Sequence, residues 1–158
     1  NLISAFIKSL RGSDVDAALY YMARILQGGE DPKFIARRMI VFASEDVGLA
    51  APAALNLAVS AYLAVERIGM PECQYVLYHC ASVLAKTKKS RATTTAMNRA
   101  QAAAREHPDL PVPLHLRNAP TKLMKDLGYT KGYKWEAGFE HQKGFLPPEI
   151  HSLRLFDE

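Results

Sequence analysis

The sequence predicts an all-α fold: a helical array followed by a short irregular or hairpin-like C-terminal tail. From residue 1 to about residue 106, apolar residues recur at spacings of three and four, without the sustained alternation that marks β-strands. Short turns rich in glycine, proline and aspartate separate these periodic segments. After residue 107 prolines become frequent, and their missing backbone donors exclude regular helix.

Turn and cap residues mark the first three helices. Gly12-Ser13-Asp14 ends one helix and caps the next, which Gly28-Gly29 then stops. Asp31-Pro32 supplies an N-cap and a proline at the first position of a third helix. This third helix should place Ile35, Met39 and Phe42 on its core side.

Three further helices follow. The segment from Pro52 to Ile68 is apolar on every side, which predicts a place in the middle of the array. The next helix repeats a core-facing pattern through Cys73, Val76, Leu77, Cys80, Val83 and Leu84. Ser90 can cap a last long helix, whose small inward residues predict tight packing on a neighbour. Those residues are Ala92, Ala96, Ala100, Ala103 and Ala104.

The remaining residues predict a less regular structure. Residues 108–117 should run extended over the surface, because three prolines fall within them. Asn118-Ala119-Pro120 then restarts a short helix that Gly128 ends, and the residues after it form a small hairpin or an ordered wrap. We expect a single domain over residues 1–158, with the array in 1–106 and the tail in 107–158.

Composition bounds the classes of function. A chain of 158 residues with 49% apolar and 23% charged residues can bury one sizeable core. The net charge of +4 favours an acidic partner such as nucleic acid, though only weakly. No apolar stretch approaches the roughly 20 residues of a membrane span, and no signal peptide is visible, so we expect a cytoplasmic protein, nucleoid-associated in a bacterium, without a membrane partner. Cys73 and Cys80 fall about 10 Å apart along one helix and should be reduced core residues.

Several motifs are distinctive in their order and spacing. The short ones are Gly12-Ser13-Asp14, Gly28-Gly29-Glu30-Asp31-Pro32, Ile35-Ala36-Arg37-Arg38, Ala43-Ser44-Glu45-Asp46-Val47-Gly48-Leu49-Ala50 and Gly69-Met70-Pro71-Glu72. A longer one spans residues 112–129 and contains His115, Arg117, Asn118, Pro120, Gly128 and Tyr129. Together they resemble the C-terminal region of the family of replication-associated recombination protein A, also called maintenance of genome stability protein A. The Werner-helicase-interacting ATPase is its eukaryotic relative.

The resemblance implies a fold and a role. Members are AAA+ ATPases related to clamp loaders that act in DNA replication, recombination and repair at stalled forks. The part similar to this chain is a helical collar through which they assemble as homotetramers. The implied partners are a second copy of the chain, DNA and replication-fork proteins. The turn Thr87-Lys88-Lys89-Ser90 is more basic than is usual in the family, and the tail after Lys134 is shorter.

The sequence offers no catalytic group. The family's ATPase module, with its ATP and magnesium, needs a glycine-rich phosphate loop that this chain lacks, so the chain alone should bind no cofactor. Glu30-Asp31 is best interpreted as a helix start. Glu45-Asp46 is either a solvated turn or a pair for Arg37, Arg38 or a neighbouring subunit. The histidines and cysteines show no metal-ligand spacing, and no nucleophile arrangement supports a helical hydrolase.

Two basic clusters remain as candidate DNA-binding residues. One interleaves cations with aromatic rings, an arrangement that suits single-stranded nucleic acid, and it comprises Arg117, Lys122, Lys125, Lys131, Lys134, Tyr133 and Trp135. The alternative is a solvated helix face with aromatics that pin the tail to the core. The second cluster, Lys86, Lys88, Lys89 and Arg91, is better interpreted as cations that offset a helix dipole. The leading functional prediction is therefore an oligomerisation domain, with a DNA-binding module as the alternative.

Overall fold

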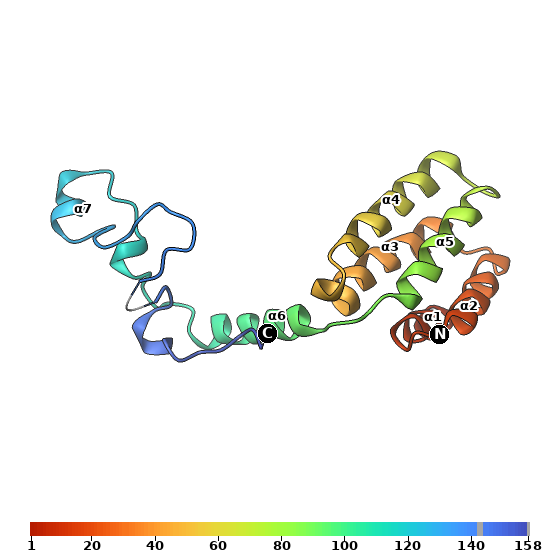
Figure 1. Cartoon of the computed structure of the whole chain (residues 1–158), viewed down its shortest axis with the longest axis horizontal. Helices are drawn as coiled ribbons and strands as arrows, with labels where there is room; N and C mark the ends of the chain where they lie inside the picture. The colour runs from red at the N-terminus through yellow and green to blue at the C-terminus, as the bar shows by residue number, and fades with distance from the viewer. Residues whose placement is uncertain (142–143, 158) are drawn as a thin grey trace. The chain divides into compact units, whose positions relative to one another are not determined.

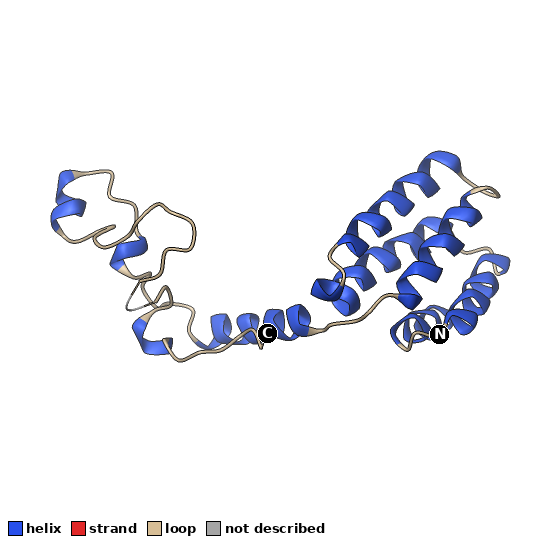
Figure 2. Ribbon diagram, in the orientation of Figure 1, coloured by secondary structure: helices blue, strands red, loops and turns tan. Residues whose placement is uncertain are grey.

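The computed structural model describes residues 1–141 and 144–157. Every regular element in these ranges is a helix and none is a strand, which confirms the predicted all-α class (Figure 2). The chain forms two compact units, residues 1–98 with the chain end from residue 156, and residues 99–155. Their boundary lies earlier than the predicted division at residue 106. Whether they fold as one domain stays a prediction.

Cap residues correctly predict the end of the first helix, both ends of the second and the start of the third. These helices are α1 (Leu2–Arg11), α2 (Val15–Gln27) and α3 (Pro32–Phe42) (Figure 1). Asp14 accepts a hydrogen bond from the backbone N–H of Ala17 at 3.0 Å, and Asp31 accepts one from Lys33 at 2.9 Å. These carboxylates satisfy amide groups that a helix start leaves unpaired.

The chain changes helix type between α3 and α4. A π-helical turn, η1 (Ala43–Val47), and a 3₁₀ turn, η2 (Gly48–Ala50), follow α3 directly. The backbone of Gly48 has φ 50°, and a Cβ there would lie 3.3 Å from the carbonyl oxygen of Ser90. Glycine is therefore favoured at this position both by its conformation and by the close approach of the later chain. No turn or cap signal in the sequence predicts the π turn.

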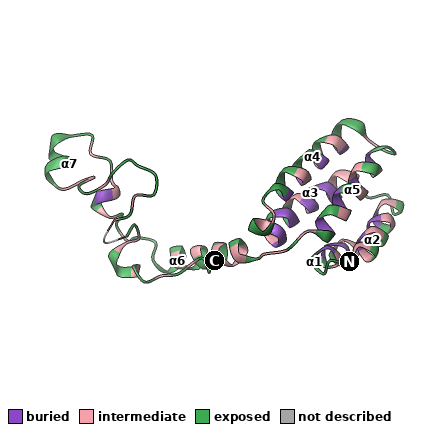
Figure 3. Cartoon of the chain, in the orientation of Figure 1, coloured by how far each residue is buried: buried purple, intermediate pink, exposed green. Residues whose placement is uncertain are grey.

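Helices α4 (Ala53–Ile68) and α5 (Cys73–Lys86) complete the array. The apolar core of the first unit is drawn from α1 to α5 and η1, and it appears as purple segments on those helices (Figure 3). Its largest fully buried members are Phe6, Leu10, Met22, Ile35, Met39, Phe42, Leu77 and Leu84. Cys73 and Cys80 are both buried and unpaired, as predicted.

The predicted central position of α4 is wrong. Its buried residues are Ala54, Ala58, Ala61 and Val65, and the helix packs against α3 and α5. The larger side chains of Leu55, Val59 and Leu63 remain substantially exposed. The alanines on the inner side of α4 allow α3 and α5 to approach it closely. The apolar residues around the whole helix therefore form one buried face and one exposed edge.

The predicted tight packing of α6 is also wrong within this chain. Helix α6 (Ala92–Glu106) contains no buried residue. Its alanines therefore do not form a buried contact with a neighbouring helix of the same chain. In Figure 3 the helix carries no purple, in contrast to α3 and α5.

Besides the end of α6, the described residues of the second unit form only short elements: η3 (Leu114–Leu116), α7 (Lys122–Asp126) and η4 (Pro148–Ile150). The extended course predicted for residues 108–117 is interrupted by η3. Thr121 caps α7, and Gly128 follows its end with φ 93°. Of the two alternatives for the tail, the irregular one is confirmed and the hairpin is not, because the described residues after Gly128 form turns and the short η4 helix but no strand.

None of the helices described here is long and apolar enough to cross a membrane.

Candidate functional site

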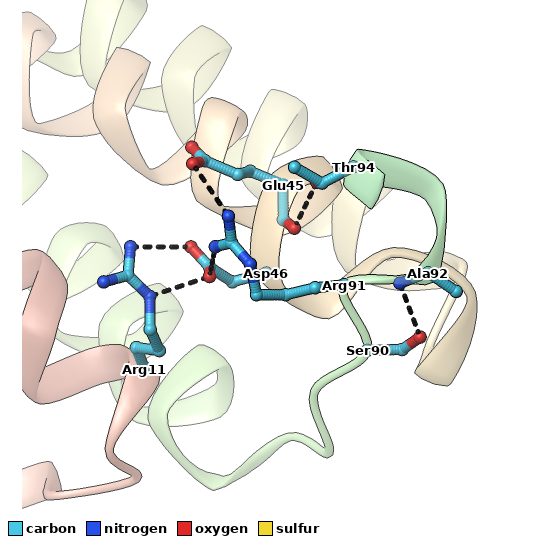
Figure 4. Close-up of polar contacts among 7 residues, drawn as sticks. All are labelled: Arg11, Glu45, Asp46, Ser90, Arg91, Ala92 and Thr94. Atoms are coloured by element: carbon cyan, nitrogen blue, oxygen red, sulfur yellow. Dashed lines mark hydrogen bonds and ion pairs between the residues drawn. The ribbon is translucent and has the colours of Figure 1, made fainter. Parts of the chain in front are cut away.

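The most connected polar site lies at the π turn η1. Asp46 is fully buried and sits between the guanidinium groups of Arg11, at the end of α1, and Arg91, just before α6 (Figure 4). Arg11 donates through Nε and Nη2 to the two carboxylate oxygens, at 2.8 and 3.3 Å. Nη1 of Arg91 donates to Oδ1 of the same carboxylate. A buried carboxylate with two cationic donors is well compensated for its loss of water.

Backbone contacts bring the start of α6 to the same place. The N–H of Ser90 donates to the carbonyl oxygen of Asp46 at 2.9 Å. The hydroxyl of Thr94, in the first turn of α6, donates to the carbonyl oxygen of Glu45 at 2.7 Å (Figure 4). The Glu45 carboxylate lies 3.7 Å from Nη2 of Arg91. The π turn therefore offers both side-chain and main-chain acceptors to the beginning of α6.

The linker between α5 and α6 is held by a lysine. Nζ of Lys89 donates to the hydroxyl of Ser13 at 2.8 Å and to the carbonyl oxygen of Ala85 at 2.6 Å. Burial lowers the pKa of Lys89, while the hydrogen bond to Asp46 raises the pKa of Arg11. Lys89 therefore places its positive charge at the C-terminal end of α5. This agrees with the interpretation that its basic cluster offsets a helix dipole.

Arg37 and Arg38 are not the partners of Glu45-Asp46, and a contact with a neighbouring subunit stays a prediction. Asp46 pairs with Arg11 and Arg91, whereas the guanidinium of Arg37 lies over the ring of Tyr62 in α4 at 5.5 Å. Asp46 is also no solvated turn residue. Arg11 and Arg91 lie 35 and 45 residues from Asp46 in the sequence, so no local spacing could have indicated them.

Arg117 differs from the other residues of the predicted DNA-binding segment. Its Nε donates to the carbonyl oxygen of Val112 at 2.7 Å, and its guanidinium lies over the ring of Tyr129 at 5.4 Å. Nη1 also donates to the Tyr129 hydroxyl at 3.3 Å. These contacts give Arg117 a structural role that joins the two ends of the 112–129 motif.

The four lysines of that segment are exposed: Lys122, Lys125, Lys131 and Lys134. Tyr133 meets Trp135 and Phe139 edge-to-face at 5.3 and 5.4 Å. Trp135 itself is 85% exposed. The structure therefore brings the aromatic residues together and leaves the lysine ammonium groups in solvent.

His115 is the buried polar residue of the second unit. Its ring stacks on His141 at 3.9 Å, and its Nε2 lies 3.0 Å from the carbonyl oxygen of Gly144. A carbonyl can only accept, so this contact requires the proton on Nε2. The pair forms one wall of a cavity of about 560 Å³, bounded also by Leu114, Lys131, Gly132 and Leu146. His115 stands in a family motif, but its burial has no sequence signal.

The other family-motif residues mostly shape the backbone. Gly12, Asp14, Asp31 and Pro32 begin or end helices. Ser13 takes a positive φ of 60°, and the peptide bond before Pro71 is cis. Glu30, Arg38, Asn118 and Pro120 make no described side-chain contact that assigns them a role.

The lysine and glycine at positions 131 and 132 do not form a phosphate loop. Thr130-Lys131-Gly132-Tyr133 lies in turns with no helix directly after it, so no helix N-terminus faces the glycine. Among the described residues no group of three or more potential ligands could hold a metal ion.

Comparison with known proteins gives a consistent result. A family model described as MgsA AAA+ ATPase C terminal matches residues 12–157. The replication-associated recombination protein A of Escherichia coli strain K12 is 46% identical over 99% of this chain. ATPase WRNIP1 of Dictyostelium discoideum is 44% identical, and the replication-associated recombination protein A of Bacillus subtilis is 35% identical, each over 99% of the chain.

The chain spans only part of these relatives. It covers 36% of the Escherichia coli protein, 18% of the Dictyostelium protein and 38% of the Bacillus protein.

Proposed function

The chain belongs to the MgsA AAA+ ATPase C-terminal family, and from this premise we propose that it is the self-association domain of a longer AAA+ ATPase. The names of its relatives support a role for that longer protein in replication and recombination. ATP and magnesium would then bind the ATPase module, because this chain lacks a phosphate loop. The expected assembly is a homotetramer, with DNA and replication-fork proteins as further partners of the longer protein.

The observation that carries the proposal is the absence of any buried residue in α6. Thr93, Thr94 and Thr95 have poor helix propensity, and a 15-residue helix without tertiary packing is marginal in water. A second copy that covers the alanine-rich side would supply that packing. The exposed edge of α4, with Leu55, Val59 and Leu63, adds apolar surface to the first unit.

The mass of the chain in solution tests this function. Light scattering after size exclusion should give a tetramer, and a strict monomer at about 100 µM would contradict the proposal. Ala96→Glu places a charge on the alanine side of α6 and should weaken association at least about tenfold. Asn98→Glu introduces the same carboxylate at an exposed residue on another side of the helix, so its association should match the wild type.

Nucleotide binding separates this domain from the ATPase module. Calorimetric titration with magnesium-ATP should show no saturable heat, because Lys131 and Lys134 lie outside any glycine cradle. Micromolar affinity would contradict our assignment of ATP to the longer protein.

A second candidate function is contact with single-stranded DNA. It is favoured by the exposed Lys122, Lys125, Lys131 and Lys134 in the same segment as the exposed Trp135. Trp135 is the chain's single tryptophan, so its fluorescence should be quenched when a base stacks on it. Titration with oligo-dT at about 50 mM salt tests this, with the quadruple lysine-to-glutamine variant as control. Equal quenching in both proteins, or none in either, would leave the segment with a structural role.

A further inference from the structure

The start of α6, residues 92–98, belongs to the first unit and is attached to it by polar contacts. No residue of α6 is buried, so apolar packing contributes little to fixing its direction. The described contacts at its start converge on η1: the Arg91 guanidinium on Asp46, the Ser90 N–H on the Asp46 carbonyl and the Thr94 hydroxyl on the Glu45 carbonyl (Figure 4). These bonds involve both the residues before α6 and its first turn. They therefore constrain direction as well as position.

Asp46 also connects α6 to the first helix of the array. Arg11 at the end of α1 holds the carboxylate through two donors, so the group that receives Arg91 cannot turn away freely. The hydrogen bonds from Lys89 to Ser13 and Ala85 hold the segment between α5 and α6, which also contains Arg91. The π turn widens the backbone where these acceptors lie, and π turns often mark functional positions.

We infer that Arg11, Asp46 and Arg91 form an ion-paired clamp that sets the direction in which α6 leaves the array, and that self-association depends on this direction. The second half of the inference rests on the proposed self-association through α6. Arg91 is a positioning residue, because it acts through the helix that it orients. Helices that pair must meet at a defined angle, so a freely pivoting α6 would lose affinity through its lost preorganisation.

Arg91→Gln is the decisive variant. It leaves Asp46 paired with Arg11, and the Arg91 side chain is 47% exposed, so the array should keep its fold. We expect its self-association to weaken at least about tenfold while its thermal unfolding midpoint stays close to that of the wild type. Arg91→Lys keeps a cation that can reach the carboxylate and should restore part of the lost affinity.

Lys88→Gln is the matched control. It removes one positive charge from the same linker, but at an exposed residue with no described partner. Its association constant should equal that of the wild type. If Lys88→Gln and Arg91→Gln weaken association equally, net charge explains the effect and the clamp is overturned. Thr94→Val removes only the hydroxyl bond to Glu45 and should weaken association less than Arg91→Gln does.

Spin-label distances test the direction of α6 without relying on assembly. Labels at Tyr75→Cys and Asn98→Cys, in chains diluted with unlabelled protein, report the angle between α5 and α6, since Cys73 and Cys80 are buried. The distance distribution should be narrow in the otherwise wild-type chain and broad in the Arg91→Gln variant. An unchanged distribution overturns the clamp, and a broad one with unchanged association overturns its link to assembly. A monomeric wild type would contradict the proposed function while the distances still decide the clamp.

Discussion

Residues 1–98 and residues 99–155 are organised on different physical principles. The first unit contains the whole apolar core, whereas His115, at 8% exposure, is the one buried residue among those described in the second. The second unit is held by ring contacts, by the Arg117 bonds to Val112 and Tyr129, and by turns. The first unit therefore owes its stability to apolar burial within the chain, and the second has little such burial to lose.

The largest expected difference between the units is in amide hydrogen exchange. Amides of α3 and α5 should exchange only on global unfolding, because these helices are central to the core. Amides of residues 107–141 should exchange by local opening, on the order of a thousandfold faster. Exchange followed by mass spectrometry of peptides measures this. Equal protection in both units would contradict the comparison.

A matched pair of leucine substitutions probes the same difference. Leu77→Ala removes a fully buried side chain of α5 and should lower the free energy of unfolding by about 2–5 kcal/mol. Leu123→Ala removes the same atoms from α7, where the side chain is 67% exposed, and should change it by less than about 0.5 kcal/mol. Urea unfolding followed by circular dichroism gives both values. If Leu123→Ala lowered the free energy of unfolding as much as Leu77→Ala, the Leu123 side chain would have to be buried in solution.

Alkaline pH should destabilise the first unit through Cys80. Burial raises the pKa of its thiol from 9.0 to about 12. The unfolded chain loses this proton near pH 9 and the folded chain keeps it, so the free energy of unfolding should fall as pH rises from about 9 to about 12. The loss is at most about 4 kcal/mol.

Cys80→Ala is the control for this titration. Lysines and tyrosines still ionise in that variant, but the contribution of Cys80 is gone, so its stability should fall less steeply with pH. Urea midpoints from about pH 8 to about pH 11 measure both slopes. Identical slopes would show that the thiol does not couple to folding.

The first unit is well predicted from the sequence because its signals are local. The caps Asp14 and Asp31, the stop at Gly28-Gly29 and the faces of α3 and α5 all follow from residues within one or two turns. The predictions for α4 and α6 fail, because periodicity reports which residues are apolar and not which of them the same chain covers. The partners of Asp46 escape prediction for a related reason, since they come from two distant segments.

The second unit is harder to predict. Its proline spacing correctly excludes long helices, and Gly128 correctly marks the end of α7. No periodic pattern in the sequence indicates that His115 stacks on His141 or that the Arg117 guanidinium lies over the Tyr129 ring. Charge alone groups Arg117 with the lysines, although its geometry makes it structural.

The smallest expected effects come from two helix caps, one in each unit. Asp14 accepts from the N–H of Ala17 at the start of α2, and Thr121 accepts from the N–H of Met124 at the start of α7, at 3.0 and 3.2 Å. Asp14→Ala should lower the free energy of unfolding of the first unit by about 1 kcal/mol, because α2 carries core residues that unfold with the rest. Thr121→Ala removes a similar bond from a five-residue helix without buried residues, so it should leave that free energy unchanged while raising the local exchange rate of Met124. Urea unfolding and site-resolved exchange separate the two effects. If Thr121→Ala costs as much global stability as Asp14→Ala, α7 unfolds together with the core, and the two units form one cooperative structure.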